Sequence, residues 1–372
     1  MSTMPPSFFI ANAQEDTWTS LAPLQSETYF LGATSIDDKI YAIGGLSFKA
    51  GYNTTTEYNP KTDTWTTKSP VPTRISDRHL SIKNLCVVTC QNKIYAIGGM
   101  EDVGVVTNTI REYNSTTDTW QTIQSTLIKR TQAVAATLKD KIYIIGGFSG
   151  APVSYYEIYN LTETYDPLTN TSSTKAPIPI PVRGASIAVS NDKIYVFGGL
   201  TYDEYACNLT QIYNPETDSW SLGSQIPTGV SFACAGVTSG EFAPRRIILL
   251  GGSAKPNISL NLTQIYDPEK DAWSNGTPMS NRRLGLAVVV VDDLFYTLGG
   301  YELTPDGGGR VLSNNDIYTP VGYGSPEPTV SPSFSPEPSN VEFPVFIVAS
   351  IIIIAVCSIT ILAYRVKTKR RS

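Results

Sequence analysis

Short apolar runs that end in two glycines recur along most of this chain. In the first, Lys39 to Gly45 (K-I-Y-A-I-G-G), the residues on both sides of Tyr41 are apolar. Such a run predicts a buried strand with a tight exit, because glycine takes positive φ and lets a neighbouring backbone approach closely. Diglycines return about every 50 residues, at residues 44-45, 98-99, 146-147, 198-199, 251-252 and 299-300.

Two aromatic landmarks follow each run. The first is a tyrosine, usually before Asn-Pro or Asp-Pro, which predicts that a second strand ends in a hairpin turn. Seven residues later comes a tryptophan, whose large ring suits packing between neighbouring units. The third repeat has Ser172 instead, which predicts poorer packing there. The tyrosines of this pattern include Tyr58, Tyr165, Tyr213 and Tyr266, and the tryptophans are Trp65, Trp120, Trp220 and Trp273.

This order of diglycine, tyrosine and tryptophan resembles the kelch repeat family over about residues 14–320. The resemblance implies an all-β, six-bladed β-propeller, one blade per diglycine. Trp18 lies in a strand with no diglycine before it, whereas the sixth diglycine is followed by Tyr318 but by no tryptophan strand. We therefore predict that the strand around Trp18 completes the last blade and closes the ring, which removes two open sheet edges.

Residues 1–13 belong to no repeat. An apolar stretch at Ser7 to Ile10 precedes Ala11-Asn12-Ala13, which matches the A-x-A pattern of a signal-peptide cleavage site. We interpret the segment as a truncated signal peptide, with the mature chain starting at Gln14. The alternative is a disordered N-terminal arm.

The composition changes after Pro320. Residues 321–344 are rich in Pro, Ser and Glu and predict a semi-extended stalk. Val345 to Tyr364 is an uninterrupted run of apolar or small residues, long enough for a transmembrane helix. The basic tail 365–372 predicts a cytoplasmic C-terminus, by the positive-inside rule. The expected location is therefore the cell membrane, with a single pass and the propeller outside.

Charge and sequons agree with this layout. The chain has 28 Lys and Arg against 33 Asp and Glu, and five of the basic residues lie in the tail. The remainder therefore carries about −10, which argues against nucleic acid as a partner. Eight Asn-x-Ser/Thr sequons are candidate glycosylation sites, although some occupy a repeated place that also suits a turn residue. They are Asn53, Asn114, Asn160, Asn170, Asn208, Asn257, Asn261 and Asn275.

Catalytic and metal chemistry have little support in the sequence. His79 is the only histidine, so a multi-histidine metal site is excluded, and no Cys-x-x-Cys motif replaces it. A Ser-His-Asp triad would rest on His79 alone, and no G-x-S-x-G, P-loop or dinucleotide motif is present. The five cysteines form no disulfide framework, and buried free thiols are expected. We predict no cofactor and no metal.

Arginines give the sharper functional signal. Arg130, Arg183 and Arg283 precede their diglycines by 16, 15 and 16 residues, and Arg78 is the candidate in the elongated second repeat. The family resemblance implies that arginines here ring the mouth of the central channel and bind acidic groups. The alternative is that they bond backbone carbonyls and hold the ring together. The first and fifth repeats have Ser26 to Phe30 and Thr228 to Phe232 instead.

Three functions are compatible with these features. The first is a monomeric surface module that binds a protein or a glycan through propeller loops. The second is an extracytoplasmic sugar-modifying enzyme similar to kelch-fold epimerases, which a carboxylate beside an arginine at the channel mouth would favour. The third is a structural component of the cell envelope. The order of propeller, stalk, single helix and basic tail resembles kelch proteins of prokaryotic, especially archaeal, cell surfaces.

Overall fold

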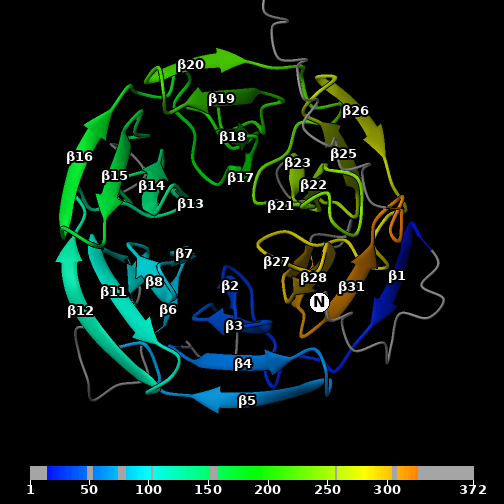
Figure 1. The fold of residues 1–372 in the computed structure, drawn as a ribbon, viewed down its shortest axis with the longest axis horizontal. Coiled ribbons are helices and arrows are strands. Elements are labelled where there is room, and N and C mark those ends of the chain that lie inside the picture. The colour runs from blue at the N-terminus through cyan, green and yellow to red at the C-terminus, as the bar shows by residue number, and fades with distance from the viewer. Residues whose placement is uncertain are drawn as a thin grey trace, which may run out of the picture. The chain divides into compact units, whose positions relative to one another are not determined.

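The computed structural model describes residues 15–47, 53–73, 81–101, 104–150, 157–255, 258–303 and 308–325. These residues form six four-stranded antiparallel sheets and three smaller ones (Figure 1). They all belong to one compact unit, residues 1–327. No helix in the described ranges is long and apolar enough to cross a membrane. The predicted signal-peptide remnant and the apolar run 345–364 lie outside the described residues.

Each large sheet takes its four strands in chain order, except that the sixth takes its outer strand from the N-terminus. Short loop strands come between the second and third strands of the second, fifth and sixth sheets. The first sheet has β2 (Gly32–Ile36), β3 (Lys39–Ile43), β4 (Thr55–Asn59) and β5 (Thr64–Lys68), and the second has β7 (Cys86–Cys90), β8 (Lys93–Ile97), β11 (Thr109–Asn114) and β12 (Thr119–Ser125). The third has β13 (Val134–Leu138), β14 (Lys141–Ile145), β15 (Thr162–Asp166) and β16 (Thr171–Lys175), and the fourth has β17 (Ser186–Ser190), β18 (Lys193–Phe197), β19 (Thr210–Asn214) and β20 (Ser219–Leu222). The fifth has β21 (Cys234–Val237), β22 (Ile247–Leu250), β25 (Thr263–Asp267) and β26 (Ala272–Asn275), and the sixth has β27 (Ala287–Val291), β28 (Leu294–Leu298), β31 (Asn315–Thr319) and β1 (Thr17–Ser20).

Short strands form small sheets in the loops. They are β6 (Ile82–Lys83), β9 (Met100–Glu101) and β10 (Val105–Val106), β23 (Ser253–Lys255) and β24 (Ile258–Ser259), and β29 (Tyr301–Leu303) and β30 (Gly309–Val311).

The six large sheets close into a ring. Their innermost strands contact one another in the cyclic order β2, β7, β13, β17, β21, β27 and back to β2, as Figure 1 shows around the central axis. The N-terminal strand β1 pairs with β31, with Trp18 opposite Tyr318. The predicted closure of the ring by the strand around Trp18 is therefore confirmed. Because β1 and β28 flank β31, the last strand of the chain is not left as an open edge.

The second strand of each sheet runs toward the diglycines. We call the face with the diglycines and the loops that follow them the mouth face. The opposite face carries the turns between innermost and second strands, such as Asn191-Asp192, and we call it the turn face. Because β31 runs antiparallel to β28, it starts at the mouth face and ends at the turn face.

The diglycines connect neighbouring sheets. The second glycine of each pair donates its N–H to a carbonyl in the entry loop of the next sheet, as Gly199 does to Val230 at 2.8 Å. A Cβ atom at Gly198 would lie 2.1 Å from the Val230 carbonyl oxygen, and both glycines have positive φ. The predicted need for positive φ and for close backbone approach is therefore confirmed at these positions.

The tyrosine and tryptophan landmarks form a second connection between sheets. Tyr213 donates its hydroxyl to Asp218 of the same sheet at 2.6 Å, and Asp218 also accepts the N–H of Ala176 from the preceding sheet at 2.9 Å. Trp220 packs against Tyr213 and donates its indole N–H to the carbonyl of Ala176 at 2.9 Å. Equivalent contacts recur around Asp16, Asp63, Asp118 and Asp271.

The third sheet lacks both parts of this connection. Ser172 takes the place of the tryptophan opposite Tyr165, and Asn170 takes the place of the aspartate that accepts the tyrosine hydroxyl. The junction between the second and third sheets therefore has neither the indole hydrogen bond nor the carboxylate bridge found at the other junctions. This agrees with the poorer packing that Ser172 predicts.

The last described residues pack on the turn face. Gly324 donates its N–H to the carbonyl of Phe242 at 2.8 Å, and the rings of Phe242 and Tyr323 are stacked. The loop that contains Phe242 is held by the buried Asp293 carboxylate, which accepts the N–H groups of Phe242 and Ala243. The described chain therefore leaves the ring on the side opposite the mouth.

Candidate functional site: the mouth of the channel

A closed ring of six residues lines the channel at the mouth face. Each lies just before an innermost strand, has a left-handed backbone and donates its N–H to the carbonyl of its counterpart in an adjacent sheet. For example, Phe232 donates to Gly184 at 2.7 Å and Gly285 donates to Phe232 at 2.9 Å. The φ angles lie between 52° and 60°, a range that bulky side chains rarely adopt. The members are Phe30, Asn84, Gln132, Gly184, Phe232 and Gly285.

The ring surrounds a central cavity of about 110 Å³. The rings of Phe30 and Phe232 lie 5.3 Å apart on one side, while Asn84 and Gln132 line the other. A Cβ atom at Gly184 would come within 2.5 Å of the Phe232 ring. The absence of a side chain at Gly184 therefore makes room for the ring of Phe232. The central cavity has an apolar half at the two phenylalanines and a polar half at Asn84 and Gln132.

A larger side cavity adjoins it. This cavity, of about 250 Å³, lies among the loops that follow the fourth, fifth and sixth diglycines, and Phe232 lines both cavities. Its apolar lining comes from Leu200, Ala206, Phe232, Leu284 and Leu303, and its polar lining from Glu204, Ser231, Ser253 and Lys255.

Arg183 bonds one lining residue of each cavity. Its guanidinium group donates to Gln132 at 2.8 Å and to Glu204 at 2.5 Å, and it stacks over the ring of Phe148 with 4.9 Å to the ring centre. The Arg183 side chain is 13% exposed and that of Glu204 is 48% exposed. Glu204 itself has a positive φ of 58°. Of the predicted arginines, Arg183 is thus the one that the structure brings to the described channel mouth.

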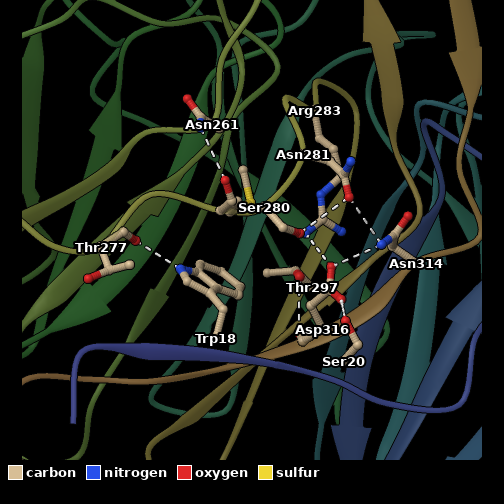
Figure 2. Close-up of polar contacts among 11 residues, drawn as sticks. Trp18, Ser20, Asn261, Thr277, Ser280, Asn281, Arg283, Thr297, Asn314 and Asp316 are labelled. Carbon is tan, nitrogen blue, oxygen red and sulfur yellow. Dashed lines mark hydrogen bonds and ion pairs between the residues drawn. The ribbon is translucent and has the colours of Figure 1, made fainter.

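Arg130 and Arg283 lie elsewhere. Arg130 is 2% exposed and pairs with Glu163 at 2.5 Å, and Arg283 is 0% exposed and pairs with Asp316 at 2.7 Å. Figure 2 shows Arg283 reaching from the entry loop of the sixth sheet to Asp316 of β31. These buried ion pairs favour the scaffold interpretation for both residues. The prediction that several arginines ring the mouth is therefore wrong for Arg130 and Arg283, and among the described candidates only Arg183 lies there. The fourth candidate, Arg78, lies outside the described residues.

The difference arises from a one-residue offset. The equivalent of Arg130 in the fourth sheet is Val182, because Gly147 bonds the Val182 carbonyl as Gly99 bonds that of Arg130. Arg183 is one position later, and side chains of successive extended residues point to opposite sides. The spacings of 16, 15 and 16 residues already contained this signal.

In five of the six large sheets, a buried polar residue that sequence reasoning missed lies two residues before the landmark tyrosine. There Gln211 exchanges two hydrogen bonds with the backbone of Ile180, and Gln264 does so with Thr228. In the second sheet Arg111 fills this position and pairs with Glu101. These residues hold the entry loops in place. The full set of large polar residues is Arg111, Glu163, Gln211, Gln264 and Asp316.

Burial changes the ionisation of groups at the mouth. Lys83 occupies the position of Arg183 in the second sheet, and desolvation lowers its pKa. Desolvation raises the pKa of Tyr29 in the first sheet, and the neighbouring Tyr301 adds to this shift.

No cluster of His, Cys, Asp and Glu that could hold a metal ion is present among the described residues, and His79 lies outside them.

The sequons divide into two structural groups. Asn53 and Asn261 donate their side-chain amides to the carbonyls of Val71 and Met279, and Asn208 donates to Gln225. These residues hold entry loops, which agrees with a repeated structural role. The exposed sequon residues are Asn160, Asn170 and Asn275. Asn114 is half-buried, and its side-chain oxygen accepts a backbone N–H in a turn. Asn257 lies outside the described residues. The described cysteines, Cys86, Cys90, Cys207 and Cys234, are free thiols.

Comparison with known proteins gives consistent results. The model of the KLHDC2/KLHL20/DRC7 Kelch-repeats domain matches residues 6–147 and 124–300. The chain is 28% identical over 269 residues to Kelch-like protein 23 of Homo sapiens, which covers 71% of this chain and 43% of that protein. It is 25% identical over 294 residues to Kelch-like protein 38 of Homo sapiens, with 77% and 46% covered. The chain thus spans less than half the length of these relatives.

A solved structure shows the same fold. The structure of YjhT superimposes with a TM-score of 0.66 and 14% identity, covering 80% of this chain and 96% of that one. At this level of identity the likeness concerns the all-β propeller fold alone.

Proposed function

Because the chain belongs to the kelch-repeat family, we propose that it is a six-bladed propeller that binds a protein or glycan ligand at its mouth face. Kelch propellers are typically protein-interaction modules. The observation that carries the proposal is the pair of cavities that share Phe232, together with Arg183, which bonds a lining residue of each. Concave, mostly apolar sites with a few fixed polar groups are the usual form of a ligand site.

The proposal includes attachment to the cell membrane. Its support is the sequence order of a Pro-rich stalk, the apolar run Val345 to Tyr364 and a basic tail. This order also supports a surface protein of the prokaryotic type with the propeller outside the cell. The last described residues lie on the turn face, opposite the mouth face.

An array experiment tests this recognition function. The full chain in detergent micelles is applied to peptide and glycan arrays, together with Arg183→Ala and a matched Arg245→Ala variant on the turn face. We expect capture by a defined set of spots that Arg183→Ala weakens and Arg245→Ala leaves unchanged. Equal capture by both variants, or no capture by the native chain, would contradict the proposal.

One observation favours a sugar-modifying enzyme as the second candidate. The Glu204 carboxylate lies beside the Arg183 guanidinium at the mouth, and a carboxylate in such a site is a candidate general base. Incubation of the full chain with N-acetylated acidic and neutral sugars, followed by proton NMR, tests this function. Turnover that Glu204→Gln abolishes would establish it, and unchanged spectra would exclude it for those sugars.

A further inference from the structure

The side cavity has a lining that selects between the two ligand classes of the proposed function. Five of its nine lining residues are apolar: Leu200, Ala206, Phe232, Leu284 and Leu303. Its volume of about 250 Å³ exceeds the roughly 150 Å³ of an apolar cavity that accommodates benzene. A leucine, methionine or phenylalanine side chain therefore fits this space.

A sugar fits the side cavity poorly. Each hydroxyl that enters an apolar site without a hydrogen-bond partner costs about 1–3 kcal/mol. The hydroxyls of Ser231 and Ser253 already donate to the carbonyls of Ser253 and Lys255. Neither serine hydroxyl therefore has a proton left to donate to a sugar hydroxyl.

The charges at the cavity edge favour an anion. Glu204 is already neutralised by Arg183. Lys255 is exposed at the end of β23, and no ion pair joins it to another described residue. The charge that a ligand meets beside the apolar lining is therefore the Lys255 ammonium group, whose complement is a carboxylate.

Resting on the proposed function, we propose that the side cavity binds a segment of a partner protein, with one large apolar side chain in the cavity and an adjacent carboxylate on Lys255. The exposed ring of Tyr205, between the lining residues Glu204 and Ala206, supplies further contact area. Tyrosine suits such a rim because it combines a large apolar ring with a polar tip. The ligand class is thus a protein with paired apolar and acidic residues.

Small peptide amides test separately the apolar side chain in the cavity and the carboxylate on Lys255. The probes are N-acetyl-leucyl-aspartyl amide, the uncharged leucyl-asparaginyl amide, the alanyl-aspartyl amide and N-acetylglucosamine. Binding to the full chain in detergent micelles is measured by saturation-transfer difference NMR. We expect saturation of the leucine methyl groups, affinity about threefold lower for the asparaginyl probe, and about tenfold lower for the alanyl probe.

Variants of the lining residues test whether the probes bind in the side cavity. Lys255→Ala should weaken the leucyl-aspartyl probe about threefold and leave the leucyl-asparaginyl probe unchanged. Ala206→Phe, which fills the cavity, should abolish binding of both. Lys129→Ala is the matched control, an exposed lysine in an entry loop outside the cavity lining, and should have no effect.

The outcomes separate this inference from the proposed function. Equal affinity for the aspartyl and asparaginyl probes, or equal loss in Lys129→Ala and Lys255→Ala, would overturn the role of Lys255. Binding that survives Ala206→Phe would overturn the assignment to the cavity. If N-acetylglucosamine alone binds and Arg183→Ala weakens it, the protein-ligand inference fails while recognition at the mouth stands.

Discussion

The buried pair of Arg130 and Glu163 provides the most direct test of the scaffold role. The side chains are 2% and 0% exposed, and Glu163 also accepts the N–H of Leu127. Replacement of one partner leaves a buried charge without its counterion, which costs about 3–5 kcal/mol. At roughly 2 °C per kcal/mol for a domain of this size, Arg130→Val should lower the melting temperature by about 6–10 °C.

The chain itself supplies the compensating change. The fourth sheet has Val182 and Gln211 at the positions of Arg130 and Glu163, and Gln211 holds its entry loop with neutral hydrogen bonds. The double variant Arg130→Val/Glu163→Gln should therefore recover most of the lost melting temperature, because no unpaired charge remains. Neutral replacement of a buried ion pair is often close to neutral in stability.

Differential scanning calorimetry of the single and double variants measures both effects. Arg183→Met is the matched control, since its partner Glu204 is half exposed and exposed ion pairs contribute about 1 kcal/mol or less. Its melting temperature should fall by about 2 °C or less. The reasoning is refuted if Arg130→Val melts like the native protein, or if the double variant melts no higher than the single one.

Three further predictions concern the sheet junctions and the mouth. The hydrogen bonds from Tyr113 and Tyr213 lower the pKa of Asp118 and Asp218 from the usual 3.8, so their stabilisation is present above about pH 4 and is lost as pH falls through the folded pKa. Because Asp118→Asn/Asp218→Asn lacks this stabilisation, its acid unfolding monitored by fluorescence should begin at higher pH than that of the native protein, and an unchanged or lower midpoint would contradict this. Gly184→Ala should lower the melting temperature by about 2–4 °C, because its left-handed backbone disfavours Cβ and the new atom meets the Phe232 ring; an unchanged melting temperature would contradict this. Trp18→Ala removes the indole hydrogen bond of 2.8 Å to the Thr277 carbonyl (Figure 2) and the contact with Tyr318. It should cost about 2 kcal/mol in urea unfolding, whereas Trp18→Phe should recover part of this loss.

Local patterns predicted most of the fold. The strand at Lys39 to Ile43 and its diglycine were predictable because alternation of side chains and the φ freedom of glycine act over a few residues. The closure through Trp18 was predictable because the first and last repeats lack complementary strands. The buried polar position two residues before the landmark tyrosine of five sheets was missed because its occupants differ in charge and size, from Gln211 to Arg111.

The sequence alone determined the all-β repeat architecture, the closing strand and the positions of the entry loops, since these depend on residues close together in the chain. Only the tertiary structure decided which loop residues form a site. A single-residue offset directs Arg183 to the mouth and Arg130 into the sheet, and the cavity beside Phe232 is assembled from loops of three sheets that lie far apart in sequence. Repeats specify the position of each loop, but the exposure and partners of its side chains depend on neighbours that the ring brings together.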